Sequence, residues 1–183
     1  MKTRTLYLVV FTLLLLLNSS SFASEPPQFR GILASHNEVR SKYQQQPLSW
    51  SETLAKYAQQ WVDHLASTQN CQMIHRPNHG DDKFQQIHGE NLFWASPEEL
   101  RNGVKKLQPL TPKEIVQAWA EEVNFYDYQS NKCKEGQDCG HFTQMVWHES
   151  QQVGCAKAIC PDKSQLWACN YYPRGNYIGE WPY

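Results

Sequence analysis

Residues 153–172 read VGCAKAIC, PDKS and QLWACNYY in succession, and this stretch decides the fold class. The two outer runs, 153–160 and 165–172, are rich in residues that favour strands, and the four residues between them are typical of a turn. The stretch therefore predicts an antiparallel hairpin. Helical patterns come before it and βαβ alternation is scarce, so we expect an α+β domain whose antiparallel sheet is covered by helices.

Two helical patterns open the domain. The first, over residues 27–44, carries apolar and aromatic side chains at helical spacing. The second is expected to begin at a capping box formed by Ser49 and Glu52 and to run to about Ser67. Its apolar face is wide, so we expect this helix to be buried.

A third helix has a clear start signal. Thr111 is typical of an N-cap, Pro112 of the first helical position and Glu114 of the capping-box acid. The apolar pattern continues to about Val123. Before this helix, residues 71–112 read as a long loop with one short extended run at 90–95.

The third helix also points to a chemically active side chain. At about 100° per residue, Glu122 falls on the apolar face with Trp119, whereas Glu121 points outward. A carboxylate on an apolar face is costly unless it meets a donor, a cation or a metal. We expect Glu122 to have such a partner, and a histidine is the first candidate. The alternative is that Glu122 is a structural acid that is only capped or paired.

The first 23 residues are typical of a secretory signal peptide. Lys2 and Arg4 precede an apolar run at 6–17, and small residues at 21–23 form a cleavage site. The apolar run would span roughly 18 Å as a helix, which is too short for a membrane core of about 30 Å. We therefore expect a signal peptide at 1–23, a domain at 24–183 and no transmembrane anchor after cleavage. The protein would be secreted and extracellular, or periplasmic in a bacterium.

Composition excludes several classes of protein. The mean hydropathy of −0.66 is too low for a polytopic membrane protein, and the 13% aromatic content is too high for a disordered chain. Lys plus Arg total 17 against 18 Asp plus Glu, so we expect no nucleic-acid partner. The 6 cysteines all follow residue 23, and export would pair them in three disulfides. Spacing alone leaves all pairings open.

The chain contains 7 histidines, and an isolated histidine is most often structural. The sequence holds no His-Glu-x-x-His and no Gly-x-Ser-x-Gly, so neither a zincin protease nor a serine hydrolase is supported.

Two motifs resemble the signatures of one family. Residues 140–147 read GHFTQMVW with Ser150 close behind, and residues 168–177 read ACNYYPRGNY. Weaker elements are HNEVR at 36–40, PLSW at 47–50 and GENL at 89–92. Together they resemble the CAP superfamily of cysteine-rich secretory, antigen 5 and pathogenesis-related class-1 proteins. The ending GNYIGEWPY at 175–183 is most similar to the plant pathogenesis-related class-1 branch.

The resemblance implies a three-layer α-β-α sandwich, braced by disulfides, with a cleft lined by two histidines and two glutamates. The four residues that match are His75, Glu90, Glu122 and His141. The loop before Glu90 is longer than in compact plant members, so His88 is the alternative to His75. The implied disulfides are Cys71 with Cys160, Cys133 with Cys139, and Cys155 with Cys169.

Two imidazoles and two carboxylates suit zinc, so we expect a weak zinc site with His75 and His141 as the ligands. The same four groups are also compatible with acid-base chemistry or with a merely structural role.

The resemblance implies a secreted monomer that binds a sterol or fatty acid in defence, antimicrobial or host-interaction roles, rather than an enzyme. Phe93 and Trp94 are the candidate lipid contacts, although burial on one strand face is the stronger interpretation. Two alternatives are a zinc-dependent hydrolase that uses the four cleft residues and a precursor that releases a signalling peptide from 173–183.

Overall fold

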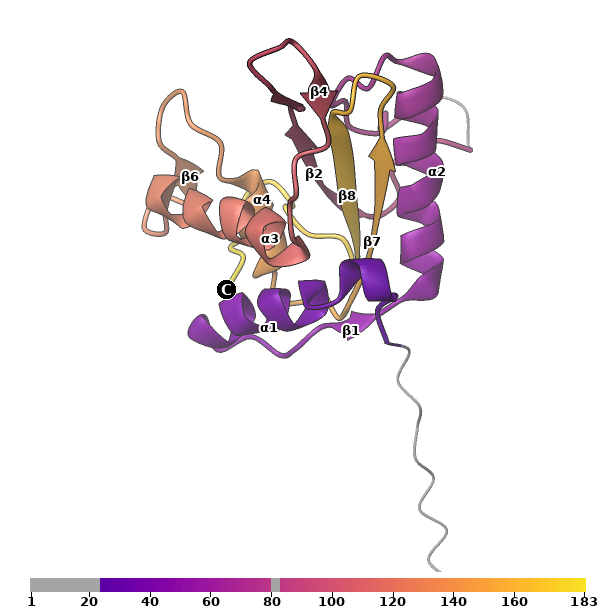
Figure 1. Ribbon diagram of the computed structural model, residues 1–183. Coiled ribbons are helices and arrows are strands. Elements are labelled where there is room, and N and C mark those ends of the chain that lie inside the picture. Colours follow the sequence, from indigo (N-terminus) through magenta and orange to yellow (C-terminus); the bar gives the residue numbers. More distant parts are fainter. Residues whose placement is uncertain (1–23, 80–82) are drawn as a thin grey trace, which may run out of the picture.

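The computed structural model describes residues 24–79 and 83–183, so the predicted signal peptide lies outside the described residues. Its helices are α1 (Ile32–Lys42), α2 (Glu52–Thr68), α3 (Pro112–Glu121) and α4 (Gly140–Met145), with short 3-10 helices η1 (Pro27–Phe29) and η2 (Glu122–Phe125). Helix α2 covers one face of the central sheet, and α1, α3 and α4 gather on the other (Figure 1). This is the predicted α-β-α sandwich. No helix in the described ranges is long and apolar enough to cross a membrane.

The central sheet contains β1 (Ser49–Trp50), β2 (Gly89–Ala95), β7 (Gln152–Ile159) and β8 (Gln165–Tyr172) in the order β1-β7-β8-β2. Strands β7 and β8 form the predicted antiparallel hairpin, and β2 pairs antiparallel with β8. The sheet is mixed rather than wholly antiparallel, because β1 runs parallel to β7.

Two small hairpins lie outside this sheet, and the sequence signals did not predict them. One consists of β3 (Glu98–Glu99) and β4 (Lys105–Lys106), and the other of β5 (Tyr126–Asp127) and β6 (Lys132–Cys133). Each strand has only two residues, which is too short for a periodic pattern to be recognised.

The helix starts differ in part from the predictions. The first predicted helix is divided, because Gly31 adopts a left-handed backbone with φ 93° between η1 and α1. The predicted capping role of Ser49 is wrong: Ser49 lies in β1, and the Ser51 hydroxyl accepts the hydrogen bond from the backbone N–H of Leu54. The capping box at Thr111 and Glu114 is confirmed.

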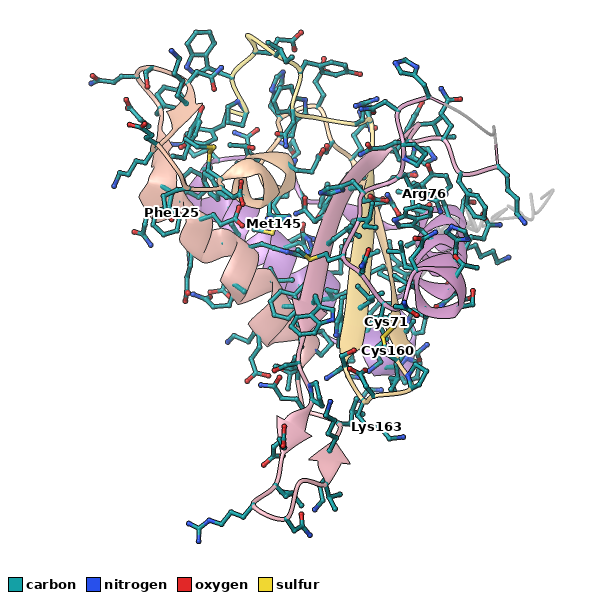
Figure 2. The ribbon with its side chains drawn as sticks, turned by 90° about the horizontal axis from the view of Figure 1, so that it is seen from above. Cys71, Arg76, Phe125, Met145, Cys160 and Lys163 are labelled. Carbon is teal, nitrogen blue, oxygen red and sulfur yellow. A yellow bond between two sulfur atoms is a disulfide. The ribbon has the colours of Figure 1, made fainter. Side chains whose placement is uncertain are left out.

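Three disulfides brace the fold, and the described residues include no free cysteine. Cys71–Cys160 ties the chain after α2 to the end of β7 (Figure 2), while Cys155–Cys169 joins β7 to β8. Cys133–Cys139 closes a short loop in front of α4. These are the pairs that the family resemblance implies.

The C-terminal segment 173–183 packs against the body of the domain. The ring of Tyr183 lies 4.8 Å from that of Tyr43 and 4.9 Å from that of Tyr128, measured between centroids. The Trp181 indole N–H donates to the backbone carbonyl of Tyr128 at 2.9 Å. A peptide cleaved from this segment would have to leave these contacts.

Candidate functional site

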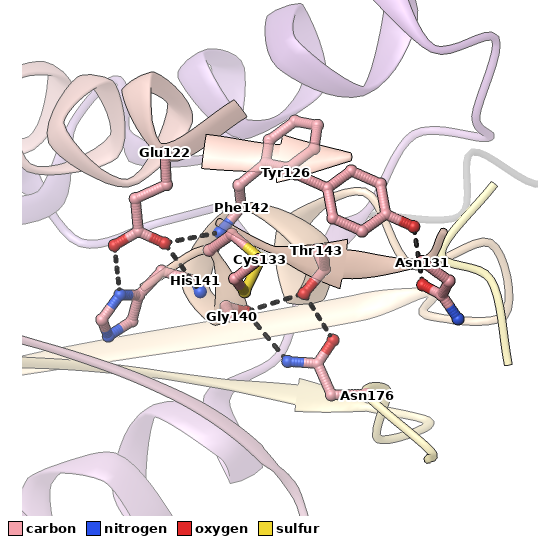
Figure 3. Close-up of a disulfide and its surroundings, with 10 residues drawn as sticks. Glu122, Tyr126, Asn131, Cys133, Gly140, His141, Phe142, Thr143 and Asn176 are labelled. Atoms are coloured by element: carbon pink, nitrogen blue, oxygen red, sulfur yellow. Dashed lines mark hydrogen bonds and ion pairs between the residues drawn. A yellow bond between two sulfur atoms is a disulfide. The ribbon is translucent and has the colours of Figure 1, made fainter. Parts of the chain in front are cut away.

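A histidine-glutamate pair forms at the junction of η2 and α4 (Figure 3). His141 Nδ1 lies 2.6 Å from Oε1 of Glu122, and Glu122 Oε2 accepts the backbone N–H groups of His141 at 3.0 Å and Phe142 at 3.3 Å. The inward position of Glu122 agrees with the helix-face argument. The Glu121 side chain is exposed and accepts a hydrogen bond from Gln117 instead.

A second pair joins the loop after α2 to the start of β2. His75 Nδ1 lies 2.9 Å from Glu90 Oε1, which also accepts the backbone N–H of Arg76 at 3.1 Å. The Glu90 carboxylate is fully buried, whereas 52% of the His75 side chain is exposed. The Nε atom of the buried Arg76 lies 3.6 Å from the other carboxylate oxygen of Glu90.

The two histidine rings face each other across an open cavity of about 570 Å³. Their centroids are 6.5 Å apart and the rings are inclined by 27°. His75, Glu90 and His141 line the cavity, and Glu122 lies behind His141. The structure thus brings all four residues of the predicted set to one place.

His88, the alternative to His75, takes no part in this arrangement. Its ring packs edge-on against Tyr57 at 4.8 Å and Tyr172 at 5.9 Å. Burial, together with the nearby charge of Arg76, lowers the pKa of His88. The neutral ring therefore belongs to a packing cluster rather than to the cleft.

Hydrogen bonds from two asparagines fix the turn that carries His141. Asn176 accepts the Thr143 hydroxyl at 2.8 Å and donates to the Gly140 carbonyl at 2.9 Å (Figure 3). Asn91 donates to the His141 carbonyl at 2.9 Å. Neither asparagine was among the predicted site residues, although Asn91 lies in the motif GENL and Asn176 in ACNYYPRGNY.

The hydrogen bonds determine what the cleft can bind. A carboxylate only accepts, so each Nδ1 must donate its proton, and each Nε2 of a neutral ring then carries a lone pair. Among the described residues, neither Nε2 has a hydrogen-bond partner. Within the same ranges, no group of three or more His, Cys, Asp or Glu side chains is placed to hold a metal ion. The cleft therefore offers two Nε2 atoms whose lone pairs can bind a ligand, and each ring is oriented by a carboxylate.

The candidate lipid contacts are separated by the sheet. Phe93 is partly buried against the core on the side of α1 and α3, whereas Trp94 is 44% exposed. Of these two residues, Trp94 is therefore the more accessible to an apolar ligand at the surface.

Comparison with known proteins shows which family and which relatives this chain is similar to. The model of the CAP family, described as the cysteine-rich secretory protein family, matches residues 33–171. Pathogenesis-related protein 1A of Nicotiana tabacum is 37% identical over 177 residues, which cover 97% of this chain and 94% of the relative.

Two solved structures have a similar fold. BmVAL-1 aligns with a TM-score of 0.65 and 24% identity, over 90% of this chain and 85% of that one. NaASP2 with Zn²⁺ aligns with a TM-score of 0.60 and 20% identity, over 90% and 88% of the two chains.

Proposed function

Because the chain belongs to the cysteine-rich secretory protein (CAP) family, we propose that it is an exported defence or host-interaction protein that binds ligands without turning them over. Its cleft would hold a divalent cation, zinc first of all, and its surface near Trp94 would take a sterol or fatty acid. The observation that carries the proposal is the pair of facing imidazoles, each with Nδ1 bound to a carboxylate. The signal-like N-terminus and three disulfides support export.

The donor set fits a weakly held zinc ion. Zinc–nitrogen bonds are about 2.0–2.1 Å long. Two imidazoles that bound the same tetrahedral zinc ion would therefore have their ring centroids roughly 5 Å apart. The observed separation is 6.5 Å, so the rings would need to approach each other somewhat. His75 lies on a loop and is half exposed, which allows this movement. NaASP2 is described with Zn²⁺, which makes zinc the first ion to test. When bound, zinc would supply a Lewis-acidic position for a water or an oxygen ligand.

Binding is favoured over hydrolysis by the composition of the cleft. The described lining residues include no serine, threonine or cysteine that could act as a nucleophile. All cysteines among the described residues are in disulfides. The hydrolase alternative would therefore have to rely on water activated by a weakly bound ion.

Zinc titration by calorimetry tests the cation site. We expect weak binding that is lost in His141→Ala and that weakens in acid, because zinc binds neutral imidazole. A chelator should leave the fold intact, as judged by circular dichroism, because two protein ligands do not form a closed structural site. Unfolding by the chelator, or undiminished binding in His141→Ala, would contradict the proposal.

The apolar site has a matched control in the chain. Trp94 is 44% exposed and Trp181 is 45% exposed, and Trp181 lies in the C-terminal segment. Binding of radiolabelled cholesterol and oleate should fall in Trp94→Ala and be unchanged in Trp181→Ala. Equal loss in both variants, or no binding by the wild type, would refute the lipid site. Substantial turnover of peptide or ester substrates that disappears in His141→Ala would support the hydrolase instead.

A further inference from the structure

Arg76, the neighbour of His75 in the chain, lies beside α2 (Figure 2) and contacts Tyr57 of α2 on one side and Glu90 of β2 on the other. We propose that Arg76 is a positioning residue of the cation site: its buried charge holds the Glu90 carboxylate, and Glu90 holds the ring of His75 with Nε2 available to the cleft. The inference rests on the proposed function for its ligand, but the positioning itself can be measured in the metal-free protein.

The Arg76 side chain is fully buried and fixed by aromatic residues. Its guanidinium carbon lies 3.7 Å from the ring centroid of Tyr57 and 5.2 Å from that of Trp61, both on α2. One terminal nitrogen, Nη2, donates to the backbone carbonyl of Tyr57. A flat guanidinium on an aromatic face is a stable arrangement that a lysine cannot reproduce.

The Nε side of the guanidinium approaches one anion, Glu90. Nε lies 3.6 Å from Glu90 Oε2, and neither Nε nor Nη1 has a hydrogen-bond acceptor among the described residues. The Glu90 side chain is also fully buried. Two buried charges this close stabilise each other, and removing one leaves the other uncompensated. The position of the Glu90 carboxylate therefore depends on Arg76.

The two halves of the cleft differ in this respect. Glu122 is held by two backbone N–H groups, and its side chain retains 16% exposure to solvent. In the described ranges no lysine or arginine forms an ion pair with it. Glu90 also accepts a backbone N–H, from Arg76 at 3.1 Å, and the Asn170 amide at 3.4 Å, but it has in addition a buried cation, the Arg76 guanidinium. The half-exposed His75 depends on Glu90 for its orientation. Loss of Arg76 should therefore disturb His75 and leave His141 as it is.

Nitrogen-15 NMR of the histidine rings, recorded on metal-free protein at alkaline pH, measures this directly. In the wild type both cleft histidines should carry the proton on Nδ1. In Arg76→Met the His75 signals should move toward a mixture of tautomers, with His141 as the internal control. Arg76→Lys should restore them in part, because it keeps the charge without the planar fork.

Zinc affinity gives a second readout. Removal of a carboxylate that orients a metal-ligating histidine lowers affinity by about 10- to 100-fold. Because Arg76 acts through such a carboxylate, we expect a loss of about 10-fold in Arg76→Met. If Arg76 acts through Glu90, the double variant Arg76→Met/Glu90→Gln should be no weaker than Glu90→Gln alone.

Each outcome separates the two proposals. If the wild type binds no zinc but the His75 signal still changes in Arg76→Met, the proposed zinc site is wrong and the positioning role of Arg76 stands. Zinc binding with unchanged His75 signals in folded Arg76→Met would overturn the positioning role alone. If Arg76→Met fails to fold while the double variant folds, the two charges are coupled as proposed. If the double variant also fails to fold, Arg76 serves packing against Tyr57, and the inference is wrong.

Discussion

At the scale of single residues, a buried hydrogen-bonded chain links the core to the cleft. His36 Nδ1 donates to the Ile32 carbonyl at 2.8 Å, and the Tyr171 hydroxyl lies 2.8 Å from His36 Nε2. Asn91 donates both to that hydroxyl and to the His141 carbonyl. The cleft histidine is therefore supported from the interior by a series of buried hydrogen bonds.

Because of His36, the stability of the folded protein depends on pH. Burial lowers the pKa of His36 from 6.5 to about 4, because the interior favours the neutral ring. Below pH 6.5 the unfolded chain takes up a proton that the folded chain does not. The contribution of the neutral His36 ring to the free energy of unfolding is therefore complete above pH 6.5. It is lost as the pH falls toward 4, by about 3 kcal/mol in total.

Urea unfolding at several pH values between 4 and 7 checks this, with His36→Gln as the control. We expect the variant to be less stable at neutral pH but to lose less stability in acid. Parallel pH curves for the two proteins would show that His36 is not the responsible group.

Glu122 and Glu121 provide a matched pair of substitutions. Glu122→Gln removes the charged acceptor from His141 and from two backbone N–H groups, whereas Glu121→Gln alters an exposed side chain. Zinc affinity should fall by about 10-fold or more in Glu122→Gln and be nearly unchanged in Glu121→Gln. Comparable losses in both, measured by calorimetry, would mean that the carboxylate behind His141 does not orient it.

At the scale of elements, the sequence predicts those parts that local chemistry determines. The capping signals of Thr111, and the strand-favouring runs and turn in residues 153–172, act over a few residues, so α3 and the β7–β8 hairpin follow from them. The parallel pairing of β1 with β7 joins residues about 100 positions apart and has no local signal. The same holds for Arg76, a charged loop residue whose burial depends on rings from α2.

The contact between α2 and β7 depends on one glycine. A Cβ atom at Gly154 would lie 2.2 Å from the Ala55 backbone nitrogen and 2.4 Å from the Ser51 carbonyl oxygen. Backbone atoms cannot rotate away, so Gly154→Ala should lower the free energy of unfolding by about 3 kcal/mol or more. Gly140→Ala is the control, because its nearest neighbour would be 3.8 Å away. Thermal unfolding of the two variants tests this packing, and equal stability would contradict it.

At the scale of the whole molecule, two hydrophobic cores lie on opposite faces of one sheet. The core beneath α2 includes Cys71 and Cys160, while the other core lies beneath α1 and α3 and reaches α4. The cleft draws His75 from the segment after α2 and His141 from α4, on the other side of the sheet. Its geometry is therefore a property of the assembled sandwich.

The disulfides should contribute unequally to the stability of this assembly. Cys71–Cys160 spans 89 residues and Cys133–Cys139 spans 6. On the chain-entropy model a crosslink over the longer loop stabilises by about 4 to 5 kcal/mol and one over the shorter loop by about 2 kcal/mol. Replacing Cys71 and Cys160 together by serine should therefore lower the free energy of unfolding by roughly 2 kcal/mol more than replacing Cys133 and Cys139, as measured by urea denaturation. The test depends on which replacement lowers the free energy of unfolding more. The short bridge directly precedes α4, so its loss could instead release His141. A larger loss of stability from the short bridge would mean that the fold depends more on the α4 region than on closure of the long loop.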